Sequence, residues 1–247
     1  MTSAPAALPD VPGIAGEVVR LRSDEAAGNR VQVRLTDTGD QPFTVTAVAL
    51  TSAAFTELTP LAATAVYVPG RTIDLPVLFG AVDCAADVHP VGARLQVDRG
   101  SGAEEVVVPL TGDALDLVVA EECAAERLAE VVSISVDGFT LDGDRARGDV
   151  VLTRVAEGPD VVVSALARSV LLEPAVADLP ATLGADDDEL TVPFSVELAS
   201  CDPHVLAETK KPFVFPLTVE AGERVVVDLP LSDAQRVELQ ELVDTVC

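Results

Sequence analysis

The chain has 247 residues, with 41 Asp and Glu against 16 Lys and Arg, which gives a formal net charge of −25. Apolar residues make up 49% of the chain, too many for a disordered acidic protein, whereas aromatic residues make up only 3%. The charge argues against a nucleic-acid partner, because phosphate binding requires a basic surface. The sequence has no run of about 18 apolar residues, so we expect no membrane span.

Residues 1–12 contain neither a basic segment nor an apolar one of the kind found in signal peptides. They contain Pro5, Pro9 and Pro12 among alanines, which predicts a short tether.

Strand signals dominate the rest of the chain. Short segments rich in Val, Leu and Thr alternate with Gly, Pro and Asp clusters, at a spacing typical of a β-sandwich or barrel. In the first half they lie at 17–21, 30–35, 43–50, 72–78, 94–97 and 105–110. In the second half they lie at 131–136, 149–154, 161–172, 190–198, 213–219 and 224–229.

Two segments predict helices, residues 120–131 and 232–243. The second has the clearer signals, with Ser232 as its N-cap and Asp233 in its first turn. We expect Val237, Leu242 and Val243 to pack on the second half of the chain.

The four cysteines mark an internal duplication. Cys84 and Cys201 each follow a predicted strand, while Cys123 and Cys247 each lie in or just beyond a predicted helix. The duplication predicts two domains, residues 13–129 and 130–247, with the disulfides Cys84–Cys123 and Cys201–Cys247.

The cysteine pattern also bears on the compartment. None of the cysteines has the CxxC spacing of zinc or thioredoxin-like sites. Two long loops, each closed once, are typical of disulfides in secreted proteins. We therefore expect an extracellular or cell-envelope protein whose signal sequence has been removed. The alternative is a cytoplasmic protein with four buried thiols.

Residues 31–114 contain an ordered set of pieces known from a structural family. They are Thr38 to Val45, Phe55, Val68 to Phe79, Ala93 to Val97 and Val108 to Ala114. In order and spacing this set resembles the immunoglobulin-like modules of the abnormal-spindle/hydin and "choice-of-anchor" type, relatives of the major-sperm-protein fold. The resemblance implies an immunoglobulin-like β-sandwich, from whose family pattern the cysteines and the helical segment depart. Together with the duplication, it leads us to expect two tandem immunoglobulin-like β-sandwiches, each with a short C-terminal helical segment. It implies scaffolding or binding and no catalytic residue.

Catalytic motifs such as GxSxG, HExxH and the P-loop are absent from the sequence. The two histidines, His89 and His204, lie near Cys84 and Cys201 but lack the further ligands of a copper or zinc site. No cofactor is therefore expected. The densest acidic run could form a weak Ca²⁺ site or a solvated turn, and the turn is favoured: Asp186, Asp187, Asp188 and Glu189.

Carbohydrate binding is disfavoured, because the chain has no Trp, one Tyr and a single Asn. A protein partner is expected instead, bound at a sheet edge or an apolar patch. The candidate edge is the strand 72–78, because it contains a proline. The residues expected to take part are Arg71, just before the strand, and Thr72, Asp74 and Pro76 within it. The sequence thus predicts a non-catalytic protein-binding or scaffold module. The alternatives are a cation-stabilised adhesin-like module and an enzyme with an unrecognised carboxylate site.

Overall fold

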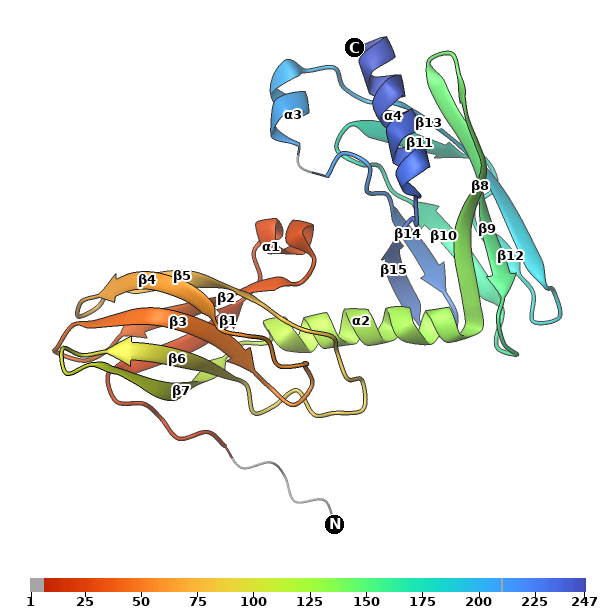
Figure 1. Cartoon of the computed structure of the whole chain (residues 1–247). Coiled ribbons are helices and arrows are strands. Elements are labelled where there is room, and N and C mark those ends of the chain that lie inside the picture. Colours follow the sequence, from red (N-terminus) through yellow and green to blue (C-terminus); the bar gives the residue numbers. More distant parts are fainter. Residues whose placement is uncertain (1–6, 210) are drawn as a thin grey trace. The chain divides into compact units, whose positions relative to one another are not determined.

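The computed structural model describes residues 7–209 and 211–247. The chain forms two compact units, Met1–Cys123 and Ala124–Cys247 (Figure 1). Strands predominate in both units and helices are few, so the predicted all-β character is confirmed. The division falls inside a helix after Cys123, whereas the duplication in the sequence predicts it after residue 129.

The first unit has seven strands in one continuous order, β4-β3-β6-β7-β1-β2-β5. Neighbouring strands are antiparallel except β1 and β7, which pair in parallel at Gly16 with Leu110. A Cβ atom on Gly16 would lie 2.6 Å from Leu110 Cδ2 and 3.1 Å from the Pro109 carbonyl oxygen, so a larger residue here would displace the Leu110 side chain. The elements are β1 (Ile14–Val19), α1 (Arg22–Ala27), β2 (Arg30–Asp37), β3 (Phe43–Thr51), β4 (Leu61–Tyr67), β5 (Thr72–Leu78), β6 (Gly92–Asp98), β7 (Ala103–Thr111) and α2 (Ala114–Val131).

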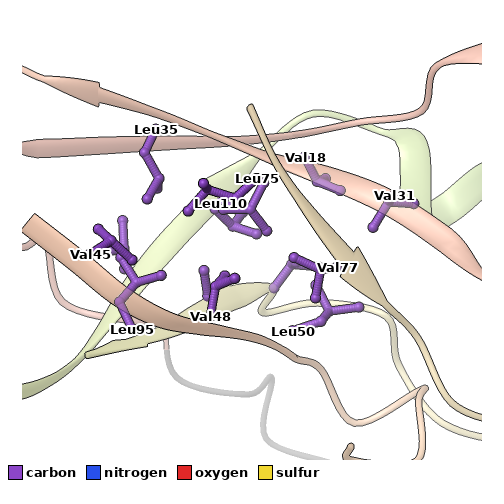
Figure 2. Packing of buried hydrophobic residues seen from close by; sticks show 14 of the residues in the cluster. Val18, Val31, Leu35, Val45, Val48, Leu50, Leu75, Val77, Leu95 and Leu110 are labelled. Carbon is purple, nitrogen blue, oxygen red and sulfur yellow. The ribbon is translucent and has the colours of Figure 1, made fainter. Parts of the chain in front are cut away.

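The core of the first unit lies between two groups of these strands. Figure 2 shows side chains of β1, β2 and β5 directed towards those of β3, β6 and β7. They include Val31 and Leu35 on one side and Val45 and Leu95 on the other, all fully buried. Buried residues alternate with exposed or half-buried ones along β5 and with half-buried ones along β6, as the two-residue period of a strand requires.

Part of the predicted tether packs on this unit. Residues 7–11 have no regular secondary structure, yet Val11 is packed against the core. The first six residues of the predicted tether lie outside the described residues.

The second unit has two four-stranded antiparallel sheets, β11-β13-β9-β8 and β12-β10-β14-β15. Its core includes Leu152, Leu172, Leu183 and Leu217, all fully buried. The elements are β8 (Val132–Asp142), β9 (Arg145–Arg154), β10 (Val161–Leu166), β11 (Leu172–Val176), β12 (Ala181–Leu183), β13 (Glu189–Leu198), α3 (Pro203–Glu208), β14 (Pro216–Glu220), β15 (Arg224–Asp228) and α4 (Asp233–Val246).

The predicted strand 161–172 is interrupted, and its end belongs to a different sheet. Ser169 Oγ accepts hydrogen bonds from the backbone N–H groups of Leu171 and Leu172, at 3.3 and 3.0 Å. This local turn separates β10 from β11, because a side-chain acceptor replaces the ladder partner at that point.

The predicted C-terminal helix is confirmed as α4. Ser232 is its N-cap and forms a capping box with Gln235. Leu239, Leu242 and Val243 are buried, but Val237 is 58% exposed, so its predicted packing is wrong. Val237 lies two positions before Leu239 and therefore on the opposite side of the helix. In the described part of the chain, no helix has both the length and the apolar character needed to cross a bilayer.

The two units have corresponding strands. Strands of the two units correspond when they pair with equivalent neighbours in their sheets. On this basis the seven strands β1 to β7 of the first unit correspond, in chain order, to β8, β9, β10, β12, β13, β14 and β15 of the second. Among the described residues of the first unit, no strand corresponds to β11. Its nearest equivalent there is the isolated bridge between Phe55 and Val82.

Candidate functional site

Both predicted disulfides are present. Cys84 is bonded to Cys123 and Cys201 to Cys247, with Cα atoms 5.7 and 5.5 Å apart. Each bond ties the segment after β5 or β13 to the helix that follows the last strand of its unit. The closed loops span 39 and 46 residues, so the two bonds restrict the unfolded chain to a similar degree. Stable disulfides are typical of an oxidising compartment.

The predicted interaction strand β5 ends the strand order of the first unit. The N–H of Asp37 donates a hydrogen bond to the carbonyl of Arg71, and the N–H of Phe79 donates one to the carbonyl of Asn29. These bonds place the odd-numbered residues of β5 in hydrogen-bonded pairs with β2, so the even-numbered residues direct their backbone groups outward. Pro76 is one of these, and its missing N–H leaves no β2 partner unsatisfied.

A hollow of about 550 Å³ lies between β4 and β5, the two terminal strands of the first unit. Its lining is apolar apart from Thr64 and Arg71, and includes Ala63, Ala65 and Leu75. Because Ala63 and Ala65 are small, they leave room beside the core rather than filling it. The sequence did not predict β4, so it could not place this hollow.

The four residues of the predicted edge have different surroundings. Asp74 forms a two-point ion pair with Arg34, at 2.8 and 3.0 Å, and the hydroxyl groups of Thr72 and Thr36 are 2.8 Å apart. Pro76 lines the hollow and is exposed. Arg71 also lines it, and among the described residues its guanidinium has neither an ion pair nor a hydrogen-bond partner.

Tyr67 supports the turn that leads into β5. Its ring is buried and stacks on Phe43 with centroids 4.7 Å apart. Burial, together with the nearby charge of Asp74, raises the pKa of Tyr67 to about 12. Gly70, at φ +80°, completes the Pro69-Gly70 turn. Arg71 follows this turn directly and lines the hollow.

Asp186, Asp187 and Asp188 lie in the loop before β13, and Glu189 is the first residue of that strand. Asp187 Oδ2 accepts a hydrogen bond from the Gly184 N–H at 3.0 Å. The Arg154 guanidinium bonds to the carbonyls of Gly184 and Asp187, at 2.8 and 3.1 Å. Within the described residues, no three of these four carboxylates come within 4.8 Å of one another. Arg154 thus holds two backbone carbonyls of this loop.

The two histidines lie apart from each other, each beside a carboxylate. His89 is 3.0 Å from Asp116, and His204 is 3.4 Å from Glu208 one helical turn later. One group of three ligand-type side chains does gather in the described residues, but two of them are the bonded sulfurs of Cys84 and Cys123. A bonded sulfur has no thiolate to offer a metal.

Sequence reasoning missed a buried carboxylate in α1. Asp24 is fully buried and accepts hydrogen bonds from Arg30, Gln32 and the Leu21 N–H, at 2.6, 2.7 and 3.0 Å. Burial alone would raise the pKa of Asp24, but these hydrogen bonds outweigh it and hold the pKa below its usual value. The helix has six residues without apolar periodicity, so the sequence held little signal of it.

Comparisons with known proteins add little to this geometry. No protein-family model matches the chain, and no curated protein does. Among solved structures it is similar to the red sea bream transglutaminase, with 11% identity and a TM-score of 0.26. The alignment covers 90% of this chain but 32% of the transglutaminase chain. This likeness is too low to support an argument about fold or activity.

Proposed function

We propose that the protein is a non-catalytic binding or scaffold module of the cell envelope or extracellular space, and that its ligand is another protein. The observation that carries the proposal is the unpaired edge of β5 beside the apolar hollow. An unpaired edge of this kind is a site at which sheets bind further strands.

We further propose that each unit is an immunoglobulin-like β-sandwich. In support, β1, β2 and β5 pair together in the first unit, as β8, β9 and β13 do in the second. Likewise β3, β6 and β7 pair together in the first unit, as β10, β14 and β15 do in the second. Immunoglobulin constant-type domains group six of their seven strands in this way, whereas the fourth strand here pairs with the third, as β4 with β3 and β12 with β10, rather than with the fifth. Such domains serve many functions, so the fold itself names no activity.

The location outside the cytosol is supported by the two disulfides. The net charge of −25 favours a partner with a basic face around the contact, and such binding weakens as salt screens the charges.

The test is capture of partners from an envelope extract on the immobilised chain, at low and high ionic strength. We expect a protein to be retained at low salt and its retention to change when Arg71 or Asp74 is reversed in charge. Arg22→Glu is the control, because Arg22 lies in α1, outside the predicted edge, and the charge change equals that of Arg71→Glu. Retention of a glycan or a small metabolite, indifferent to salt and to these changes, would overturn the proposal.

A further inference from the structure

We propose that the hollow between β4 and β5 binds an extended segment of the partner protein. The segment pairs antiparallel with β5, turns alternate apolar side chains into the hollow, and presents a carboxylate to Arg71. This inference rests on the proposed function and specifies the chemistry of its ligand.

The backbone of β5 offers a regular set of hydrogen-bonding groups to such a segment. Thr72, Asp74 and Leu78 direct both N–H and C=O away from β2, because their odd-numbered neighbours hold the bonds to β2. Pro76 contributes its carbonyl alone. A docking strand can therefore pair along the length of β5, with one donor missing in the middle.

The second unit shows how this chain covers the same edge. Residues 72–84 align without gaps to residues 189–201, which matches Pro76 with Pro193 and Cys84 with Cys201. In the second unit, β11 lies antiparallel along β13 from Leu198 to Phe194 and stops next to Pro193. In the described part of the first unit the corresponding contact is the bridge between Phe55 and Val82, and no described strand pairs with the outer edge of β5.

The sequence of β11 indicates the side chains that suit such an edge. Leu172 is buried and Pro174 and Val176 are half-buried, whereas Glu173 and Ala175 between them are exposed. An apolar residue at every second position thus faces inward from this strand. A strand paired with β5 should also carry an apolar residue at every second position, because the lining of the hollow includes the apolar residues Ala63, Ala65 and Ile73.

Arg71 indicates the charge of the docking segment and the direction in which it runs along β5. Arg22, Arg71 and Arg224 are the arginines whose side chains have no partner among the described residues, and of these Arg71 lines the hollow. In a chain with 41 carboxylates, an unpaired arginine at a groove favours a carboxylate supplied from outside. Arg71 precedes β5, so the C-terminal end of an antiparallel segment reaches it. Repulsion between two chains of charge −25 opposes a second copy as the occupant.

The test uses a fluorescein-labelled peptide with valine at alternate positions, threonine and lysine between them, and glutamate at its C-terminal end. Binding to the whole chain is followed by fluorescence anisotropy. Arg71→Glu should weaken binding by about tenfold or more, because a charge-assisted contact becomes a repulsion. Thr72→Pro should weaken it about two- to tenfold, because one outward N–H is lost.

Matched controls separate the groove from general charge and fold effects. Arg22→Glu makes the same charge change elsewhere in the first unit, and Glu189→Pro makes the same backbone change at the aligned position of β13, so both should bind like the unmodified chain. With both peptides amidated at the C-terminus, the peptide that has glutamine in place of glutamate should bind more weakly and respond little to Arg71→Glu. If the Arg71 or Thr72 variant fails to fold, amide shifts of Thr72, Asp74 and Leu78 on titrating the unmodified chain decide the matter.

Equal binding by all variants, or unmoved amide signals along β5, would overturn the inference. So would sedimentation that shows a dimer broken by Thr72→Pro, since the occupant would then be a second copy. If a protein is still captured from the extract in those cases, the proposed function stands and only this docking mode fails.

Discussion

The two units of this chain share seven corresponding strands but differ in how they treat one edge. In the second unit, β11 covers five residues of β13, from Phe194 to Leu198. In the first unit, the segment in the same place makes one bridge at Phe55 and leaves β5 open beside an apolar hollow. Each unit has its own buried core, although one edge is covered and the other is open. The fold can therefore form with this edge either covered or open, so the open edge of β5 is not a requirement of folding.

The units also differ in their polar interiors. The first buries the carboxylates of Asp24 and Asp37, whereas in the described part of the second unit the buried polar side chains are the neutral Ser169 and Thr218. The disulfides, by contrast, join corresponding positions in both units. Each of these likenesses and differences can be tested by a change made in one unit and its counterpart in the other.

The largest expected effect is the loss of a disulfide. Replacing Cys201 and Cys247 together by Ser should lower the free energy of unfolding of the second unit by about 4 kcal/mol, because the unfolded chain gains loop entropy. Replacing Cys84 and Cys123 should affect the first unit to a similar degree. Denaturant titration measures both, and hydrogen exchange in α4 should speed up in the first variant alone. Unaltered exchange in α4 would show that Cys247 does not hold the helix.

The next effect concerns the packing of α4. Leu239→Ala should cost about 3 kcal/mol of stability, because a fully buried side chain leaves a cavity. Val237→Ala, on the exposed side of the same helix, should change stability by less than about 0.5 kcal/mol. Thermal unfolding of the two variants compares them directly. Equal losses would mean that the helix buries a different face.

A third pair of changes tests the covered edge against the open one. Ala175 forms a hydrogen-bonded pair with Ser195, so Ala175→Pro should cost about 1–3 kcal/mol through the lost ladder bond. Thr72→Pro, on the open edge of β5, should cost less than about 1 kcal/mol. A larger cost at Thr72 than at Ala175 would contradict the assignment of β5 as the open edge.

The smallest effect is a pH dependence confined to the first unit. Because hydrogen bonds lower the pKa of folded Asp24, its contribution to stability is fully present above the unfolded pKa, near 3.9, and is lost as pH falls through the lower folded pKa. The first unit should therefore lose stability in that acidic window, and Asp24→Asn should remove this part of the dependence. Urea unfolding between pH 5 and pH 2, followed by NMR signals of each unit, tests it. An unchanged acid profile in Asp24→Asn would contradict the prediction.

Much of the framework was predictable from the sequence because its signals are local. Two-residue alternation marked most strands, Ser232 marked the start of α4, and the repeated order of strand, cysteine and helix predicted both disulfides. The missed elements lack such signals. Strand β4 consists largely of Ala, Thr and Val, and this composition indicates neither a strand nor a helix clearly. Helices α1 and α3 have only six residues each, too few to show a helical periodicity.

The sequence by itself determined the all-β class, the duplication, the disulfide pairing and the proline that suits β5 to an edge. Only the tertiary structure decided what lies beside that edge. The hollow is lined by residues of β4 and β5. Whether Arg71 has an ion-pair partner depends on which carboxylates the fold brings near each arginine, and Asp74 is paired with Arg34. Neither property is local, because both depend on residues that folding brings together from separate strands. A sequence pattern can therefore indicate an edge, but the chemistry of what binds there emerges from the assembled strands.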